Sequence, residues 1–271
     1  MLDFSQLPDV SKLHPELKGP GEREFAAHMK AREDALRHIF GAPYPNGNIL
    51  VASDTKLMLN WPGGGVYQYP ANLNRHGWHY VTSGLAQPVP DNNTATAQDI
   101  PFSGLGIELV ISTPERAAWP LDVLINLVRY LLFQKTARVV LPGDRVPCNG
   151  PLVRDTDTKL NHLLARFSSE YENEIGLPAG RCCLVHLVGV TEAEIANALT
   201  LGKGTAGSIV LSRVMDEMGV GCVSDPRREC LTTRDGFSVI WNRAKSECEA
   251  IWQFKAAKRR ATGNGDNKIG A

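Results

Sequence analysis

The sequence predicts an α+β domain, a mixed, mainly antiparallel sheet with flanking helices. Two observations lead to this fold class. Helical and strand-like patterns are interspersed along the 271 residues without the regular alternation of parallel βαβ units. The composition, with 43% apolar and 21% charged residues, is typical of a folded globular protein that buries a sizeable core.

The N-terminal third is expected to contain one helix followed by strands. Residues 20–38 carry apolar side chains on one side of a helix, and Gly41 ends it. Short apolar or alternating runs separated by Pro, Gly and Asn then predict strands at 49–60, 65–69 and 77–82.

A polar loop, residues 88–99, precedes the best-marked elements. Residues 105–112 alternate between apolar side chains and others, which predicts a strand. Pro120 opens a helix in the first turn, where its missing N–H costs nothing, and Asp122 lies near the positive end of the helix dipole. A wide stripe of Leu and Val follows, so this helix should be buried.

The C-terminal half is expected to mix helices with strands. Residues 183–190 are apolar on both faces, as in a central strand, and Thr191 with Glu194 forms a capping box for the next helix. The remaining expected elements are a polar helix near 156–166, a helix at 208–218 and strands at 220–224 and 236–241.

The chain is expected to form one domain, residues 20–254, after an irregular segment, residues 1–19, and before a disordered tail, residues 255–271. The 29 basic and 29 acidic residues give a net charge of zero, so no nucleic-acid or membrane partner is expected. The tail is basic, and the preceding body has 24 basic and 28 acidic residues. Contact between the tail and nucleic acid is a weaker alternative.

We expect a cytoplasmic protein with reduced thiols. No segment approaches the roughly 20 apolar residues of a membrane span, and the N-terminus lacks a secretory pattern. The six cysteines include no CxxC pair, and the neighbours Cys182 and Cys183 would bond poorly.

Two motifs suggest ligand sites but lack the context that such sites need. Residues 202–207 (GKGTAG) match the GxGxxG pattern, but a helix rather than a strand is expected before them, which favours a connector between helices. Residues 76–80 (HGWHY) crowd two imidazoles beside aromatic rings, but no spacing supplies further metal ligands. We therefore expect no cofactor and no metal.

A hydrolase is the alternative to a binding protein. A thiol nucleophile such as Cys183 would need a base such as His186, and Glu108 could act as one of a pair of carboxylates. Cys183 and His186, however, fall on opposite faces of the expected strand. No catalytic residues are therefore assigned.

Five segments resemble the N-terminal domain of the Suppressor of fused family in order and approximate spacing. They are residues 77–84 (GWHYVTSG), 103–111 (SGLGIELVI), 119–133 (WPLDVLINLVRYLLF), 142–147 (PGDRVP) and 184–192 (LVHLVGVTE). Weaker similarity extends the match to about residues 30–242, through the segments 159–164, 202–214 and 224–229.

The resemblance implies a non-enzymatic, protein-binding domain with the fold of the Suppressor of fused N-terminal domain. Eukaryotic members sequester a transcription factor by clamping an extended peptide, and many bacterial members look like immunity proteins that neutralise a toxin. Because the chain ends soon after the matched domain, the bacterial-type role is expected. The partner would be another protein, a toxin or a peptide segment bound in extended form.

The resemblance also implies which residues bind the partner. Tyr80 matches a peptide-contacting tyrosine, although Gly77 stands where the family has His, and Asp91 corresponds to an acidic residue of the following loop. The full expected set consists of aromatic, imidazole and acidic side chains on these strands and loops: Trp78, His79, Tyr80, Asp91, Glu108 and Asp144.

Overall fold

The computed structural model describes residues 22–44, 55–61, 64–72, 75–87, 102–134 and 136–263. The helices are α1 (Glu22–Phe40), α2 (Thr55–Asn60), α3 (Trp119–Phe133), α4 (Glu192–Leu199), α5 (Ala206–Glu217), the 3-10 turn η3 (Leu231–Thr233) and α6 (Phe237–Gly263). The strands are β1 (Gly65–Tyr69), β2 (Trp78–Ser83), β3 (Phe102–Thr113), β4 (Arg145–Pro147), β5 (Leu160–Arg166), β6 (Glu174–Leu177) and β7 (Gly180–Thr191). The predicted irregular segment 1–19 and the predicted loop 88–99 lie outside the described residues.

The strands form one sheet in the order β1-β2-β3-β7-β5-β4, with β6 paired to β7. Among the described strands every neighbouring pair is antiparallel except β3 and β7, which run parallel. The predicted fold class is therefore confirmed. Strands β3 and β7 are the longest, at 12 residues each, and they lie in the middle of the sheet.

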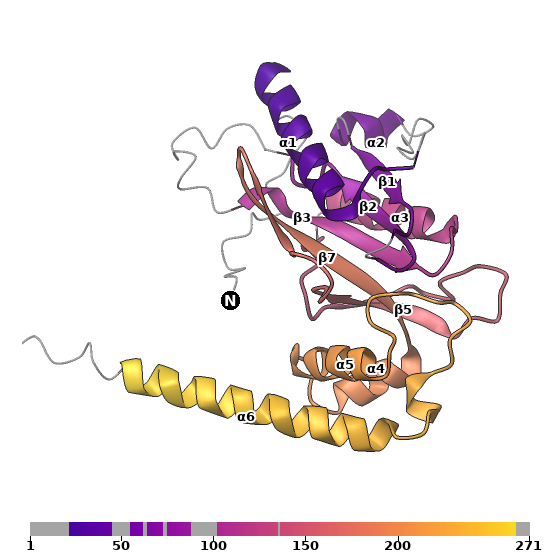
Figure 1. The fold of residues 1–271 in the computed structure, drawn as a ribbon, viewed down its shortest axis with the longest axis vertical. Helices are drawn as coiled ribbons and strands as arrows, with labels where there is room; N and C mark the ends of the chain where they lie inside the picture. Colours follow the sequence, from indigo (N-terminus) through magenta and orange to yellow (C-terminus); the bar gives the residue numbers. More distant parts are fainter. Residues whose placement is uncertain are drawn as a thin grey trace, which may run out of the picture.

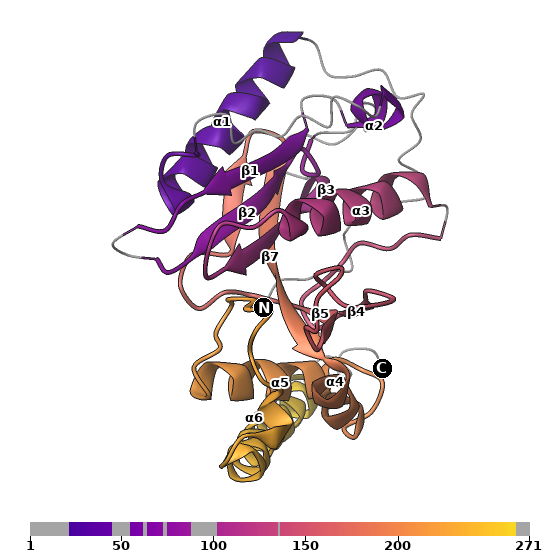
Figure 2. The ribbon, with the colours of Figure 1, turned by 90° about the vertical axis from the view of Figure 1, so that its right-hand side faces the viewer.

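Strand β7 is covered on both faces. Side chains alternate between the faces of a sheet, so Cys183 and Val185 pack in the cluster that contains α3. On the opposite face Leu184 packs with α1, and Val190 packs with α4, α5 and α6. Figures 1 and 2 show α1 and α3 on either side of one half of the sheet, while α4, α5 and α6 gather at its other end.

Two helix starts form as the sequence indicates. Pro120 lies in the first turn of α3, and Asp122 is in the same turn. The Thr191 side chain accepts a hydrogen bond from the Glu194 backbone N–H, and the Glu194 carboxylate accepts one from the Thr191 N–H. The predicted capping box at the start of α4 is therefore confirmed.

Two segments were assigned to the wrong kind of element. Residues 55–60, part of the strand predicted at 49–60, form helix α2, and the remainder of that segment lies outside the described residues. The polar helix predicted near 156–166 is wrong because its last seven residues form β5. There Leu163 and Leu164 pack in clusters on opposite faces of the sheet. Successive side chains thus alternate between the two faces, as they do in a strand.

Two strand predictions near the C-terminus are also wrong. Within 220–224 only Val223 forms a bridge, to Ser112 of β3. Residues 236–241 enter helix α6, where Phe237 and Trp241, one helical turn apart, pack together against α5 with centroids 5.8 Å apart.

Helix α6 extends well beyond the part that packs on the domain. It continues to Gly263, so the disordered tail predicted from Lys255 is wrong for residues 255–263. Cys248 is buried, but Ile251 is 45% exposed and Phe254 is 71% exposed. In Figure 1 this end of α6 projects away from the other elements.

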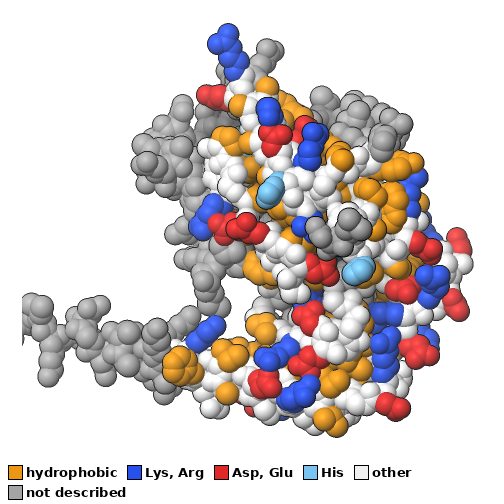
Figure 3. Space-filling view, in the orientation of Figure 1, with side chains coloured by type: hydrophobic (Ala, Val, Ile, Leu, Met, Phe, Trp, Pro, Cys, Tyr) orange, Lys and Arg blue, Asp and Glu red, His pale blue; other side chains and the backbone are white. Residues whose placement is uncertain are grey.

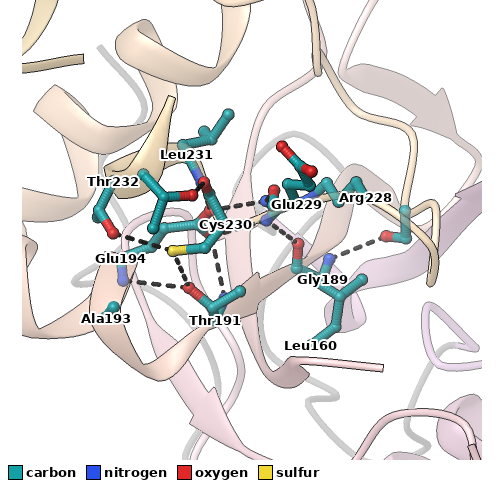
Figure 4. Close-up of polar contacts among 12 residues, drawn as sticks. Leu160, Gly189, Thr191, Ala193, Glu194, Arg228, Glu229, Cys230, Leu231 and Thr232 are labelled. Atoms are coloured by element: carbon teal, nitrogen blue, oxygen red, sulfur yellow. Dashed lines mark hydrogen bonds and ion pairs between the residues drawn. The ribbon is translucent and has the colours of Figure 1, made fainter. Parts of the chain in front are cut away.

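A buried ion pair joins the segment after α5 to the start of α4 (Figure 4). Arg228 donates to both carboxylate oxygens of Glu194 at 2.6 Å, and its Nη2 also donates to the Gly189 carbonyl at 2.9 Å. Glu194 additionally accepts from the Leu231 N–H at 2.7 Å. Both side chains are almost fully buried, so each charge depends on the other for its stabilisation.

Two histidines lie within the sheet face covered by α1. His79 Nδ1 hydrogen-bonds to Ser112 Oγ at 2.6 Å, and His186 Nδ1 hydrogen-bonds to Tyr171 Oη at 2.9 Å. Burial, and then repulsion from Arg75, lowers the pKa of His79 to about 4. Burial also lowers the pKa of His186 well below its ordinary value. The folded protein therefore favours the neutral form of both rings.

Replacing Arg228 by Met should lower the free energy of unfolding by about 3–5 kcal/mol, because Glu194 is left buried and uncompensated. The matched change Arg227→Met, at an exposed neighbour, should alter the free energy of unfolding by no more than about 0.5 kcal/mol. Urea denaturation monitored by circular dichroism measures both. Equal unfolding midpoints for the two variants would refute a stabilising role for the pair.

Acidification should destabilise the fold through His79. Between about pH 6.5 and 4 the unfolded chain binds a proton at this ring and the folded chain does not, so stability falls as pH decreases across this window. The loss from His79 should approach about 3 kcal/mol. Comparing wild type with His79→Gln at several pH values isolates this contribution, since the opposite effect of the raised Glu108 pKa is present in both proteins. Parallel pH dependences would contradict the assignment.

Candidate functional site

The groups proposed for a hydrolase do not form a reactive set. Cys183 is buried on the α3 face of the sheet, and His186 lies on the opposite face beside Tyr171. Burial raises the pKa of the Cys183 thiol to about 11, so it is not a thiolate at neutral pH. All six cysteines of the chain are free thiols.

Glu108 organises the turn after β2. Its carboxylate accepts hydrogen bonds from the Thr82 hydroxyl at 2.7 Å and from the backbone N–H groups of Gly84 and Ala86 at 2.7 and 3.1 Å. The side chain is fully buried, and burial raises its pKa. Because no part of Glu108 reaches the surface, its side chain is not available to a partner in this conformation.

His79 and Tyr80, also expected to bind a partner, point into the two opposite faces of the sheet. His79 is 1% exposed and Tyr80 is fully buried. The Ala117 N–H donates to Tyr80 Oη at 2.6 Å, which fixes the segment before α3 against β2. Both side chains therefore belong to the packing that covers the two faces of the sheet.

Trp78, the first residue of β2, is only half buried and belongs to a surface cluster. Its ring lies edge-on to Tyr44, with centroids 5.6 Å apart. The guanidinium of Arg116 lies 4.4 Å from the Tyr44 ring centroid and 5.7 Å from the Trp78 ring centroid. Tyr44 is 38% exposed, and Arg116 also donates to Gln68 Oε1 at 3.1 Å. We call Tyr44, Trp78 and Arg116 the aromatic–arginine cluster.

Gly77 positions this cluster. Its φ of +84° is in the left-handed region, and a Cβ there would lie 2.3 Å from the Thr113 carbonyl oxygen. A histidine at this position would clash with β3. The backbone conformation and the close approach of β3 at the start of β2 therefore require glycine. The turn places Trp78 at the edge of the covered face.

Asp144 holds the turn before β4. One carboxylate oxygen accepts from the Leu141 N–H at 2.8 Å, and the other pairs with Arg138 at 3.0 Å. Its side chain is 13% exposed, whereas that of Arg138 is 72% exposed. Asp144 thus mainly stabilises the turn, whereas the guanidinium of Arg138 is exposed to solvent beside it. Asp91 lies outside the described residues.

The 202–207 segment joins two helices, α4 and α5, as the sequence indicates. Arg145 Nη2 donates to the carbonyls of Lys203 and Gly204 at 2.6 and 3.1 Å. The segment therefore presents backbone acceptors to a cation, which is the reverse of a phosphate-binding loop.

Within the described residues, no three His, Cys, Asp or Glu side chains are grouped so that they could hold a metal ion. None of the described helices is long and apolar enough to cross a membrane. Figure 3 shows Lys and Arg side chains interleaved with Asp and Glu over one face of the molecule, without a large field of a single sign.

Tyr44 and Arg116 were not identified from the sequence. Both residue types are frequent at the centres of protein interfaces. Their spacing from Trp78, however, does not show that the three meet, because they come from the segment after α1, from β2 and from the segment before α3.

Comparison with known proteins identifies the family. The model of the family described as Suppressor of fused protein (SUFU) matches residues 61–229. A search of curated proteins gave no match.

Two solved structures show the same fold, and a third is reported for comparison. A Sufu–Fu complex structure has a TM-score of 0.54 at 23% identity, and the alignment covers 75% of this chain and 91% of that chain. A SUFU homologue from Neisseria gonorrhoeae has a TM-score of 0.50 at 18% identity, covering 75% and 96%. Drosophila Suppressor of Fused has a TM-score of 0.49 at 20% identity, covering 69% and 46%.

The matched region runs from the end of α2 to the Arg228 ion pair and includes all of the described strands. It spans more than half of the chain. The chain therefore belongs to the Suppressor of fused family.

Proposed function

We propose that this protein is a non-enzymatic binding protein that sequesters or neutralises a partner protein, in an immunity or antitoxin role in the cytoplasm. The observation that carries the proposal is the aromatic–arginine cluster on a chain of this family. Tyr44, Trp78 and Arg116 present one partly exposed tyrosine, one half-buried tryptophan and one exposed arginine side by side. Tyr, Trp and Arg are the residue types that contribute most often to the energetic centre of protein interfaces.

The arrangement of the cluster suits it to binding. The arginine holds both rings through cation–π contacts, so the rings lose little conformational freedom when a partner covers them. One of the solved family members is a Sufu–Fu complex, and a protein partner for this chain accords with that structure.

The charge of the body suggests the chemistry of the partner. Residues 1–254 contain 24 basic and 28 acidic residues, which favours a basic partner such as a nuclease toxin. This attraction is small, so we attribute the specificity of binding to the cluster and not to net charge.

The structure offers little support for the hydrolase alternative. Cys183 and His186 are separated by the sheet, and Glu108 is saturated with hydrogen bonds from Thr82 and the β2 turn. A substrate would have to reach groups that are at most 1% exposed.

Changes in the cluster should weaken partner binding. Tyr44→Ser or Arg116→Ala should each raise the Kd for the captured partner about 10–100-fold, because each removes a central contact. The matched control Arg37→Ala, at an exposed position on α1, should leave the Kd unchanged. The partner would be obtained by affinity capture from native lysate and by co-expression with candidate toxins, and its Kd measured by calorimetry. Unchanged affinity in both cluster variants would exclude this surface, and no rescue from any toxin would count against the immunity role.

The purified protein should show no turnover on a panel of ester, peptide and nucleotide substrates. Cys183→Ser, His186→Gln and Glu108→Gln should differ from wild type in stability only. Activity that disappears in one of these variants while the circular dichroism spectrum is retained would refute the binding-only function.

A further inference from the structure

A groove of about 610 Å³ runs between α3 and β4, on the face of the sheet opposite α1. Its lining includes five aliphatic side chains: Val123 and Leu127 of α3, Val140, Val146 of β4 and Leu163 of β5. The lining of the groove includes Asp144, which the resemblance implies for partner binding, and it does not include the aromatic–arginine cluster.

Strand β4 forms one wall of the groove and is the terminal strand of the sheet that the described residues form. The Cys148 N–H donates to the Asn161 carbonyl, and the Asp144 carbonyl accepts from the Ala165 N–H. In this register Val146, the middle residue of β4, also directs its backbone groups at β5. The N–H and C=O of Arg145 and the C=O of Pro147 therefore point to the other side. Among the described residues they have no backbone partner there. An edge with free backbone groups accepts a further strand.

The rim of the groove carries one exposed cation, Arg138. Asp144 is 13% exposed and both of its oxygens are used, whereas the Arg138 side chain is 72% exposed and makes one ion pair. A guanidinium has five N–H donors, so Arg138 can bind a second carboxylate. Arg145 also lines the groove, but its guanidinium donates to the carbonyls of Lys203 and Gly204, in the segment between α4 and α5.

The one thiol in the groove is not activated. Cys148 lines the groove, and burial raises its pKa to about 11. It is a neutral, weakly polar group at neutral pH, so the groove is built to hold a ligand and not to attack it.

We propose that this groove binds an extended peptide segment of a partner protein, which pairs with the free edge of β4, inserts a bulky aliphatic side chain between α3 and β4, and places a carboxylate on Arg138. Because alternate residues of a strand point to the same side, the acidic residue lies two positions from the aliphatic one. The proposal goes beyond the proposed function, since the groove can bind such a peptide whether or not the aromatic–arginine cluster binds a partner.

The test uses short peptides and the full chain labelled with ¹⁵N. The probe is acetyl-Thr-Ile-Thr-Glu-Thr-amide, titrated to 1 mM, and the matched probe has Lys in place of Glu. The Glu peptide should shift the amide signals of residues 145–149 and of the groove side of α3, and the Lys peptide should bind at least 10-fold more weakly. No shift in these residues with the Glu peptide, or shifts confined to another surface, would overturn the proposal.

Charge reversal at the rim tests the role of Arg138. In Arg138→Glu the preference should invert, so that the Lys peptide binds at least 10-fold more tightly than the Glu peptide. Arg37→Glu, on the opposite face of the sheet, should keep the wild-type preference. Because Arg138→Glu also removes the ion pair with Asp144, its fold is checked by its amide spectrum, and Arg138→Gln should abolish the preference without inverting it. An unchanged preference in both Arg138 variants would disprove the carboxylate contact.

Backbone pairing is tested with two further peptides, N-methylated at alternate residues. Only one of the two sets of amides faces β4, so one methylated peptide should lose binding and the other should retain it. Retained binding by both would rule out strand addition. These outcomes are independent of partner capture, because failure of the groove variants leaves the Tyr44→Ser and Arg116→Ala results unaffected.

Discussion

Burial of β7 on both faces is the constraint on which the rest of the structure depends. This strand contacts α1, α3 and the α4–α6 group through alternate side chains, so it connects the three hydrophobic clusters that the described residues form. A strand in this position cannot carry an unpaired charge, and its one imidazole, that of His186, is therefore bonded to Tyr171. The same burial places Cys183 and His186, two groups of the hydrolase hypothesis, where a substrate cannot reach them.

Much of the fold could be predicted because several signals are local. The capping box at Thr191, the proline at the start of α3 and the apolar run of β7 each specify an element within a few residues. The errors occurred where the pattern is ambiguous over a short range. β5 and the start of α6 contain apolar residues at spacings that fit either period, and the choice between them is made by packing against β7 and α5, which the sequence does not display.

The candidate site was less predictable than the fold, for a related reason. The family resemblance directed attention to β2 and β3, but it could not show which side chains of these strands are covered. Helices on both faces bury His79, Tyr80 and Glu108, and only Trp78, at the strand end, reaches the surface. Its neighbours Tyr44 and Arg116 are distant in sequence and meet it only because the sheet brings their segments together.

The long α6 helix has a consequence for how the protein could be linked to other molecules. Trp252 is the last of its described side chains that packs on the hydrophobic cluster, and from there to Gly263 the helix rises about 16 Å at 1.5 Å per residue. This length acts as a stiff spacer, so a fluorophore or fused domain attached after Gly263 would be held clear of the sheet. Such a label would report rotation of the whole molecule with little disturbance of either the aromatic–arginine cluster or the groove beside β4.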